Sequence, residues 1–495
     1  MANFQIGDAM PEFAYFEDLY DQDSLALTTT SSGLAVYEDD NGYQIVLNGS
    51  GFTYADGRIT GGQINSIEFL DDNGGSLIDV SGGNFPALAT TLGLAPGEVD
   101  LWVFMGTLTA GNDDIHGSSV GNDLNFGANE GNDLIVASDG GSFMTGSDGK
   151  DTMKGGDGWD MISFESTFWL DDDKQGIVLN AAKGTIYDSW GDKDKFDKLF
   201  EEYLGSTYAD TFIGSNRDDV FDGMKGKDKI DGGSGDDEVR YNRDELRGGD
   251  NGIVADLEKG KVKDGFGTTD KVERVENVLG TIFDDVFKGD GGDNKFRGLS
   301  GVDSFNGRKG NDVIQFEYWQ DLGQHGVDVD LSLSTGQVKD NGFGNVETLI
   351  SIESLEGGDL NDQLRLGSAG GYAWGGKGDD ILTAGRAGDW LGGSSGADTF
   401  AFLSSAAVGA PGDNAARSFI DDFSHAEGDL INFSALGSMS FIGTNAFSNE
   451  AGQLRYEFVD GNTLIHGDMD GNGQADLMLE LNGEINLASD DFVLA

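Results

Sequence analysis

The most constraining feature of this chain is an aspartate that recurs at every ninth residue of one segment. Its members are Asp210, Asp219, Asp228 and Asp237. Gly226 and Gly235 stand two residues before the last two aspartates, and a large apolar residue follows each aspartate by two positions. The repeating unit is therefore the nonapeptide G-G-x-G-x-D-x-U-x, where U is large and apolar. A flexible glycine-rich linker is the alternative, since 80 of the 495 residues are glycine, but a linker needs no nine-residue phase.

Each nonapeptide predicts a tight turn followed by a short strand. Glycines permit backbone angles that a Cβ forbids, and x-U-x forms a strand whose apolar residue points inward. Two nonapeptides complete one coil, so each turn stacks on the turn two repeats earlier, and carbonyls and carboxylates face each other across a gap. Calcium, which takes roughly six to eight oxygen ligands, suits that gap. The expected fold is all-β, with tandem calcium-binding parallel β-rolls (a right-handed β-solenoid), strand-rich spacers and β-rich caps.

The same phase returns in three further stretches, so four β-roll blocks are expected, at residues 107–165, 205–242, 280–316 and 357–403. Ser142, Asn294 and Gly371 occupy aspartate slots, and these slots are expected to bind calcium weakly or not at all. Besides the run already named, with Gly226 and Gly235, the candidate calcium ligands are Asp113, Asp123, Asp133, Asp151, Asp160, Asp285, Asp303, Asp312, Asp362, Asp380, Asp389, Asp398, Gly310 and Gly378.

A longer repeat lies between the blocks. The run G-I-V-A-D-L at residues 252–257 matches G-V-D-V-D-L, which begins 74 residues later, and Gly176-Ile177-Val178-Leu179 begins a weaker copy. Period-two alternation predicts strands there. Strand-rich spacers are therefore expected at residues 166–204, 243–279 and 317–356, and each repeating unit is expected to cover the open end of its neighbour.

The charge of the chain connects its folding to calcium. Asp and Glu total 89 against 31 Lys and Arg, which gives a formal charge of −58. Such a chain repels itself without metal and also repels nucleic acid. At millimolar calcium and a dissociation constant on the order of 10⁻⁴ M, each site contributes about 1.4 kcal/mol. About a dozen such sites would dominate the few kcal/mol that separate the folded from the unfolded chain. The chain is thus expected to stay unfolded in the cytosol and to fold outside the cell.

The N-terminus offers no recognisable export signal. Residues 1–23 are acidic, with neither a basic n-region nor an apolar h-region. No apolar run reaches the length of about 18 residues that predicts a transmembrane helix. The absence of cysteine excludes disulfides, thiol catalysis and cysteine–zinc sites. Secretion would need another signal.

Residues 419–495 contain a candidate export signal, which is indicated by a family resemblance. The matching text comprises F-I-D-D-F (419–423), G-D-L-I-N-F (428–433), residues 441–456 and 466–477, and the ending S-D-D-F-V-L-A. It is similar to the C-terminal region of the serralysin group, and the nonapeptide blocks resemble the RTX (hemolysin-type) calcium-binding superfamily. The resemblance implies a type I ABC exporter that reads the C-terminus without cleavage, and a location outside or on the surface of a Gram-negative-type bacterium. Residues 404–495 are expected to form a serralysin-like cap with this signal, and deletion after Leu487 to leave folding intact because the tail offers little area.

Within that cap, D-x-D-G-N-G-x-x-D resembles half of an EF-hand calcium loop, with oxygen ligands from Asp468, Asp470, Asn472 and Asp476. The twelfth position is Leu479 rather than glutamate. A calcium loop and a metal-free acidic turn both remain open.

No catalytic constellation emerges, so a non-enzyme is expected. Serralysins carry H-E-x-x-H, but here His116, His325, His425 and His466 are isolated. A G-x-S-x-G string at residues 117–121 lacks the strand–turn–helix context and a partner histidine, and chance explains it in a chain rich in glycine and serine. Acidic residues are too many for any glycosidase pair to stand out.

Residues 1–106 lack the nonapeptide and alternate like strands. They are expected to form a β-rich cap or, alternatively, a recognition domain that uses Phe13, Tyr15, Phe16 and Tyr20. The expected function is a secreted non-catalytic calcium-binding component of a cell surface, matrix, surface layer or adhesion system, with cell-surface polysaccharide or self-assembly as partner. The alternative is a secreted polysaccharide-active enzyme, such as an epimerase, lyase or glycosidase, with β-rolls as accessory modules.

Overall fold

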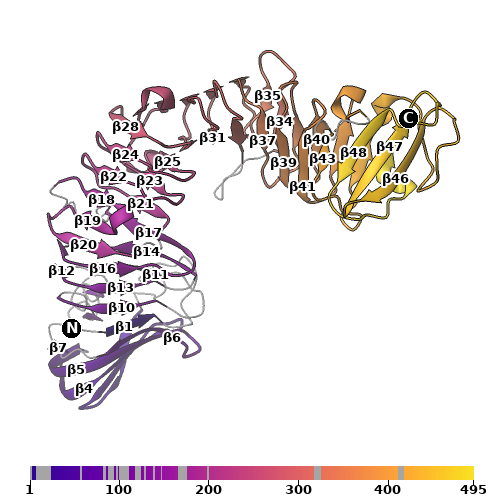
Figure 1. Cartoon of the computed structure of the whole chain (residues 1–495). Helices are drawn as coiled ribbons and strands as arrows, with labels where there is room; N and C mark the ends of the chain where they lie inside the picture. The colour runs from indigo at the N-terminus through magenta and orange to yellow at the C-terminus, as the bar shows by residue number, and fades with distance from the viewer. Residues whose placement is uncertain are drawn as a thin grey trace. The chain divides into compact units, whose positions relative to one another are not determined.

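The computed structural model describes residues 3–6, 24–55, 58–81, 85–86, 94–95, 98–99, 111–117, 124–127, 130–137, 140–146, 148–164, 175–197, 200–316, 325–410 and 417–495. These residues form strands joined by turns and by single turns of 3-10 helix (Figure 1). Two compact units divide the chain: residues 1–239 with 270–274, and residues 240–269 with 275–495. No helix in the described ranges is long and apolar enough to cross a membrane. The 3-10 turns are η3 (Ala181–Lys183), η4 (Glu245–Arg247), η5 (Leu257–Lys259), η6 (Ser405–Ala407), η7 (Ser434–Leu436) and η8 (Ser489–Asp491).

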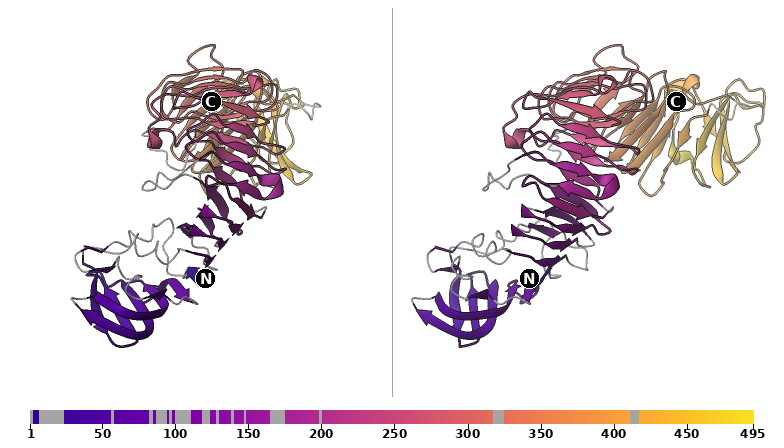
Figure 2. Two further views of the ribbon diagram at one scale, coloured as in Figure 1. Left: turned by 90° about the vertical axis from the view of Figure 1, so that its left-hand side faces the viewer. Right: turned by 60° about the vertical axis from the view of Figure 1, so that its left-hand side comes forward.

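An antiparallel sheet begins the first unit, shown in indigo in Figure 2. The strands near the N-terminus are β1 (Asn3–Ile6), β2 (Ala26–Thr30), β3 (Leu34–Glu38), β4 (Gln44–Ala55), β5 (Arg58–Leu70), β6 (Ser76–Ser81), β7 (Phe85–Pro86), β8 (Leu94–Ala95) and β9 (Glu98–Val99). β1 pairs antiparallel with β6 and parallel with β10 (Asp114–His116), so this sheet continues directly into the coils. Its core includes Ile45, Ile67 and Phe69, all fully buried. The aromatic residues at positions 13–20, considered for recognition, lie outside the described residues.

The coils of the first unit have the phase that the nonapeptides predict. Their strands are β11 (Leu124–Gly127), β12 (Glu130–Gly131), β13 (Leu134–Val136), β14 (Gly141–Thr145), β15 (Asp148–Gly149), β16 (Thr152–Lys154), β17 (Trp159–Ser163), β21 (Glu202–Leu204), β22 (Thr211–Ile213), β23 (Val220–Asp222), β24 (Lys229–Asp231) and β25 (Glu238–Arg240). β22 pairs in parallel with β24, with Phe212 beside Ile230, so a coil contains 18 residues. Both side chains, and Phe221 between them in sequence, point inward and are buried. The all-β β-roll prediction is confirmed.

The second unit repeats the arrangement. Its coil strands are β29 (Asn277–Leu279), β30 (Val286–Lys288), β31 (Lys295–Arg297), β32 (Ser304–Asn306), β33 (Val313–Gln315), β37 (Ser354–Glu356), β38 (Gln363–Arg365), β39 (Tyr372–Lys377), β40 (Ile381–Ala384), β41 (Trp390–Ser395) and β42 (Thr399–Phe402). The inward residues of successive coils stack, as the rings of Phe287 and Phe305 do at 4.9 Å between centroids. Such aromatic columns supply the apolar core of a narrow solenoid.

The spacers contain strands that continue the sheets of the coils. The spacer strands are β18 (Val178–Asn180), β19 (Thr185–Tyr187), β20 (Lys193–Phe196), β26 (Val254–Asp256), β27 (Lys261–Lys263), β28 (Thr269–Glu273), β34 (Asp328–Asp330), β35 (Val338–Asp340) and β36 (Thr348–Ile350). In the first spacer, β20 pairs in parallel with β16 and antiparallel with β19, and β18 pairs antiparallel with β19 and in parallel with β22. These strands therefore pair with the edges of both adjacent coils.

The C-terminal strands close the second unit. They are β43 (Phe419–Ile420), β44 (Leu430–Asn432), β45 (Ser440–Phe441), β46 (Gln453–Val459), β47 (Asn462–Asp468), β48 (Leu477–Leu481) and β49 (Phe492–Val493). β46, β47 and β48 form an antiparallel sheet, and β48 also pairs with β43.

The tail of the chain belongs to this fold, which corrects the expectation that it adds little to folding. β49 pairs with β44, with Phe492 beside Ile431. The Phe492 ring is buried and lies 4.9 Å from that of Phe441. Asp491 accepts a hydrogen bond from the Ala488 N–H at 2.6 Å and lies 2.6 Å from His425 Nδ1. Deletion after Leu487 would remove a paired strand as well as the expected export signal.

Candidate metal centres

The aspartates of the nine-residue grid form columns of buried carboxylates along the turns. Those that the structure describes are at most 4% exposed; Asp123 lies outside the described residues. One oxygen of each carboxylate joins successive coils: the Asp210 N–H donates to Asp228 Oδ1 at 2.7 Å, and the Asp285 N–H donates to Asp303 Oδ1 at 2.8 Å. The same 18-residue step joins Asp219 to Asp237, Asp133 to Asp151, Asp362 to Asp380 and Asp380 to Asp398.

The second carboxylate oxygen of several of these aspartates could hold a metal ion. Within the described ranges, a buried Oδ2 without a hydrogen-bond donor occurs in Asp133, Asp151, Asp303, Asp312 and Asp380. A buried acceptor without a donor costs about 1–3 kcal/mol, and more when it is charged. A column of such oxygens is stabilised either by protonation of the carboxyl groups or by a bound cation. Calcium, a hard cation with oxygen ligands, fits these residues.

Glycine keeps the space beside these oxygens open. A Cβ added to Gly298, Gly307 or Gly375 would collide with the Oδ2 atom of the aspartate five residues later. Gly235, Gly310 and Gly378 have positive φ values of 147°, 124° and 116°, and an added Cβ there would strike the backbone of the adjacent turn. At Gly226 it would meet the Tyr208 carbonyl oxygen at 2.5 Å. The predicted glycines therefore lie where stacked turns bring carbonyls and carboxylates together.

A glycine substitution should test whether the space beside the aspartate Oδ2 atoms is needed for calcium binding. We expect Gly298→Ala to raise the calcium concentration needed for folding and to cost about 1–3 kcal/mol, as overpacking does. Gly291→Ala is the matched control, because it lies in the same block and an added Cβ meets nothing within 4 Å. Neither glycine has a positive φ, so the two positions are compared by the room available for an added Cβ. Circular dichroism during calcium titration measures the calcium concentration at which half of each variant is folded. Equal concentrations for the two variants would contradict a role for this space in calcium binding.

Burial strongly opposes ionisation of the metal-free carboxylates. Burial raises the pKa of Asp151 to about 9 and that of Asp380 to about 8. Burial, with the neighbouring Glu347 carboxylate, raises the pKa of Asp303 to about 10. A bound cation would reverse this effect by favouring the charged form.

The same shifts predict how pH acts on the metal-free fold. Because the folded pKa values exceed the ordinary value of 3.8, the folded state binds more protons than the unfolded chain. This contribution to stability is complete below pH about 4 and is lost as pH rises through about 8–10. We therefore expect calcium-depleted protein to show more strand by circular dichroism at pH 5 than at pH 9. Calcium affinity should rise over the same range, and a strand signal independent of pH would contradict this linkage.

Several columns continue through residues that the sequence did not single out. After a spacer, the carboxylate that accepts the aspartate N–H comes about 41–43 residues later instead of 18: the Asp151 N–H donates to Asp194 Oδ1 at 2.8 Å, and the Asp160 N–H donates to Glu201 Oε2 at 2.9 Å. The other acceptors of this kind are Asp270, Glu353 and, after a shorter step, Asp429. Asp194-Lys195-Phe196 keeps the D-x-U pattern, so searching each spacer for that triplet would have found it.

Arg308 lies at one of the turns whose aspartate position is occupied by another residue. Asn294 stands in the aspartate position of the turn that starts at Gly289, and its side-chain oxygen accepts the Asp290 N–H at 2.9 Å. Arg308 Nη1 donates a short hydrogen bond to the Gly289 carbonyl oxygen, and its Nη2 donates to Asp256 Oδ1 at 2.9 Å. A guanidinium therefore supplies the positive charge at this turn.

Loss of Arg308 should weaken the coil without removing a calcium site. Arg308→Met is expected to cost about 1.5–3 kcal/mol, as for hydrogen bonds to charged groups, while the number of calcium ions bound at saturation stays unchanged. Lys309→Met is the control, because it removes an exposed positive charge from the same turn. Thermal melting and isothermal titration with calcium test the two quantities, and fewer bound ions in Arg308→Met would contradict this assignment.

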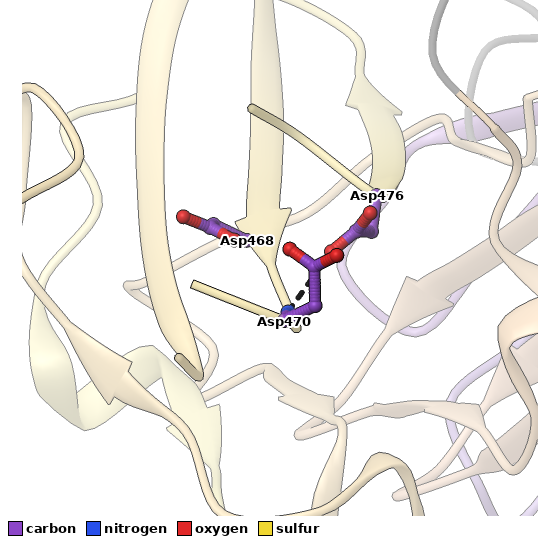
Figure 3. Close-up of side chains that lie close together, drawn as sticks. All are labelled: Asp468, Asp470 and Asp476. Atoms are coloured by element: carbon purple, nitrogen blue, oxygen red, sulfur yellow. Dashed lines mark hydrogen bonds between the residues drawn. The ribbon is translucent and has the colours of Figure 1, made fainter. Parts of the chain in front are cut away.

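The C-terminal acidic loop joins β47 to β48 and brings three carboxylates together. Oxygens of Asp468, Asp470 and Asp476 lie within 4.8 Å of one another, and Figure 3 shows Asp470 turned towards Asp476. Backbone N–H groups already donate to these side chains, from Gly471 and Gly473 to Asp468 and from Asp470 to Asp476. The Asn472 amide donates to Asp470 Oδ2 at 3.0 Å. The loop accommodates both interpretations, and calcium binding there stays a prediction.

The histidines each lie beside a carboxylate. The distances are 2.8 Å for His116–Asp114, 3.7 Å for His325–Asp340, 2.6 Å for His425–Asp491 and 3.1 Å for His466–Glu457. The G-x-S-x-G string falls mostly outside the described residues, since only Gly117 is described.

Family comparisons agree with this geometry. The model of the RTX calcium-binding nonapeptide repeat matches residues 127–162, 204–239 and 279–314, and that of the peptidase M10 serralysin C-terminus matches residues 359–494. The second match begins upstream of residue 404, where the sequence placed the start of the cap. No curated protein matches the chain.

Solved structures provide partial likenesses. The R2 subunit of mannuronan C5-epimerase AlgE6 from Azotobacter vinelandii is 25% identical with a TM-score of 0.21, covering 30% of this chain and 82% of its own. The R3 subunit of the same enzyme is 20% identical with a TM-score of 0.16, covering 43% and 79%. Extracellular lipase LipA from Serratia marcescens is 14% identical with a TM-score of 0.16, covering 95% and 84%.

Proposed function

This chain carries RTX calcium-binding nonapeptide repeats and a serralysin-type C-terminal region, and on that premise we propose that it is a secreted, non-catalytic protein that folds on extracellular calcium. Its role is that of a cell-surface, matrix, surface-layer or adhesion component. A type I ABC exporter delivers it through its C-terminus, and calcium outside the cell then joins its turns.

The observation that carries the proposal is the column of buried Oδ2 atoms without donors, as at Asp303, Asp312 and Asp380. In a chain of charge −58, these carboxylates make the metal-free coils costly and the calcium-bound coils stable. The fold then depends on a cation that is abundant outside the cell and scarce inside it.

The burial of the grid carboxylates supports a non-catalytic role. The grid carboxylates are buried inside the turns and bonded to the backbone of the next coil, so they are poorly placed for a soluble substrate. The four histidines belong to separate carboxylate pairs. A general acid or base must reach its substrate within about 2.6–3.2 Å.

Two measurements on the purified protein test this function. Electron microscopy with and without millimolar calcium should show extended particles, sheets or filaments only with calcium. Incubation with alginate and other acidic polysaccharides, followed by chromatography for shortened or unsaturated products and by NMR for epimerised residues, should show no turnover. Turnover in the presence of calcium would overturn the non-catalytic assignment and favour a polysaccharide-active enzyme.

A further inference from the structure

β39, β41 and β43 are neighbouring strands of the second unit (Figure 1). They carry a row of partly exposed aromatic side chains. Tyr372 lies opposite Trp390, and Trp390 lies opposite Phe419. The Trp390 side chain is 48% exposed, and its ring centroid is 4.8 Å from that of Phe419. With Trp374, these residues are called the aromatic strip below.

Trp374 lies two residues after Tyr372 in β39 and widens the strip along the strand. It is 37% exposed and lies over Gly392, because a Cβ at Gly392 would be 2.5 Å from atoms of the indole ring. The glycine lets the indole lie close against the sheet. Large apolar side chains gathered on one outward face differ from the single exposed ones that any surface carries.

Each end of the strip has a carboxylate that is paired with a basic side chain. At one end, Glu356 accepts a hydrogen bond from the Tyr372 hydroxyl at 2.6 Å and pairs with Lys295 at 3.0 Å. At the other end, Glu480 lies opposite Phe419, 3.4 Å from Arg417 Nη1, and accepts a hydrogen bond from the Asn462 amide at 2.7 Å. The strip is thus an apolar surface between two polar and nearly neutral ends.

The size of the strip selects among partners. An aromatic side chain can bury about 150–250 Å², so four partly exposed ones offer on the order of 300 Å². A standard protein interface needs about 800 Å² from each partner. A strongly anionic polymer gains nothing from a neutral strip on a chain of charge −58.

We propose that the aromatic strip is a binding site for a neutral polysaccharide. A pyranose ring presents a face of C–H groups that stacks on an aromatic ring, and its hydroxyls can donate to the Glu356 and Glu480 carboxylates at the ends of the row. Successive sugar rings would follow the aromatic residues from strand to strand. This site deepens the proposed surface role and rests on it only for the extracellular location.

The test uses the calcium-loaded full chain in native gels that contain hydroxyethyl cellulose, galactomannan or alginate. We expect retardation by a neutral polymer, and dissociation constants about tenfold weaker in Trp390→Ala and Trp374→Ala. Trp390→Tyr should keep most of the binding because it keeps a ring. Trp159→Ala is the matched control, because this tryptophan is 45% exposed but lies in the other unit.

Other results would overturn the site. These are no retardation by either neutral polymer, equal binding by Trp390→Ala and wild type, or retardation by alginate alone. Concentration-dependent dimerisation that Trp390→Ala abolishes would assign the strip to self-association instead. The calcium midpoint of each variant, from circular dichroism, confirms that it folds. Failure here leaves calcium-dependent folding and the absence of turnover standing, so the two proposals fail separately.

Discussion

Removing calcium from this protein with EGTA should convert its strand signal in circular dichroism to that of a disordered chain. The orphaned oxygens of Asp151, Asp303 and Asp380 would then have no counter-charge, and the chain would carry its full charge of −58. At about 1.4 kcal/mol for each occupied site, the loss over about a dozen sites exceeds a net stability of roughly 5–15 kcal/mol. Millimolar calcium should restore the signal.

Magnesium provides the control for this experiment. It demands a small octahedral site and holds its waters, so it should not restore the strands. Hydrogen exchange should show that calcium removal affects residues 205–316 and 357–403 most, because the N-terminal sheet has its own core of Ile45, Ile67 and Phe69. A calcium-free chain with its full strand signal and melting temperature would contradict calcium-driven folding.

The sequence predicts the coils well because their information is local. Each x-U-x triplet sets one inward residue and each glycine-rich turn sets one reversal, so a nine-residue phase is sufficient to place Phe212 beside Ile230. Burial of the aspartates also follows from that phase. Carboxylate columns that cross a spacer do not follow from it, because the step from Asp151 to Asp194 depends on how three spacer strands pair.

Long-range contacts explain the other differences. Arg308 reaches the Gly289 carbonyl and Asp256 only after two coils have stacked on each other, and nothing in the local pattern predicts that pairing. The aromatic strip has the same origin, since Tyr372, Trp390 and Phe419 become neighbours through strand register. The tail was misjudged because Phe492 meets Phe441 across 51 positions of sequence.

Deletion after Leu487 should abolish the appearance of the protein in the medium when the matching type I transporter is present. The resemblance of residues 419–495 to the serralysin C-terminus implies that a type I exporter reads this ending without cleavage. The folded cap holds the same residues, with Phe492 against Phe441 and Asp491 beside His425. Deletion should therefore also lower the stability of the calcium-loaded protein, so loss of secretion alone would not identify a signal.

Phe441→Ala separates the two effects, because it removes the ring contact with Phe492 and leaves the tail sequence unchanged. We expect this variant to melt at a lower temperature with calcium, yet to be exported at the normal rate, since cytosolic calcium is too low to fold the cap before export. Residues 419–495 fused to an unfolded passenger should confer export. Quantitative blotting of medium and cells gives the readout. Normal secretion of the chain truncated after Leu487 would place the signal elsewhere, and loss of export in Phe441→Ala would mean that the exporter requires a packed cap.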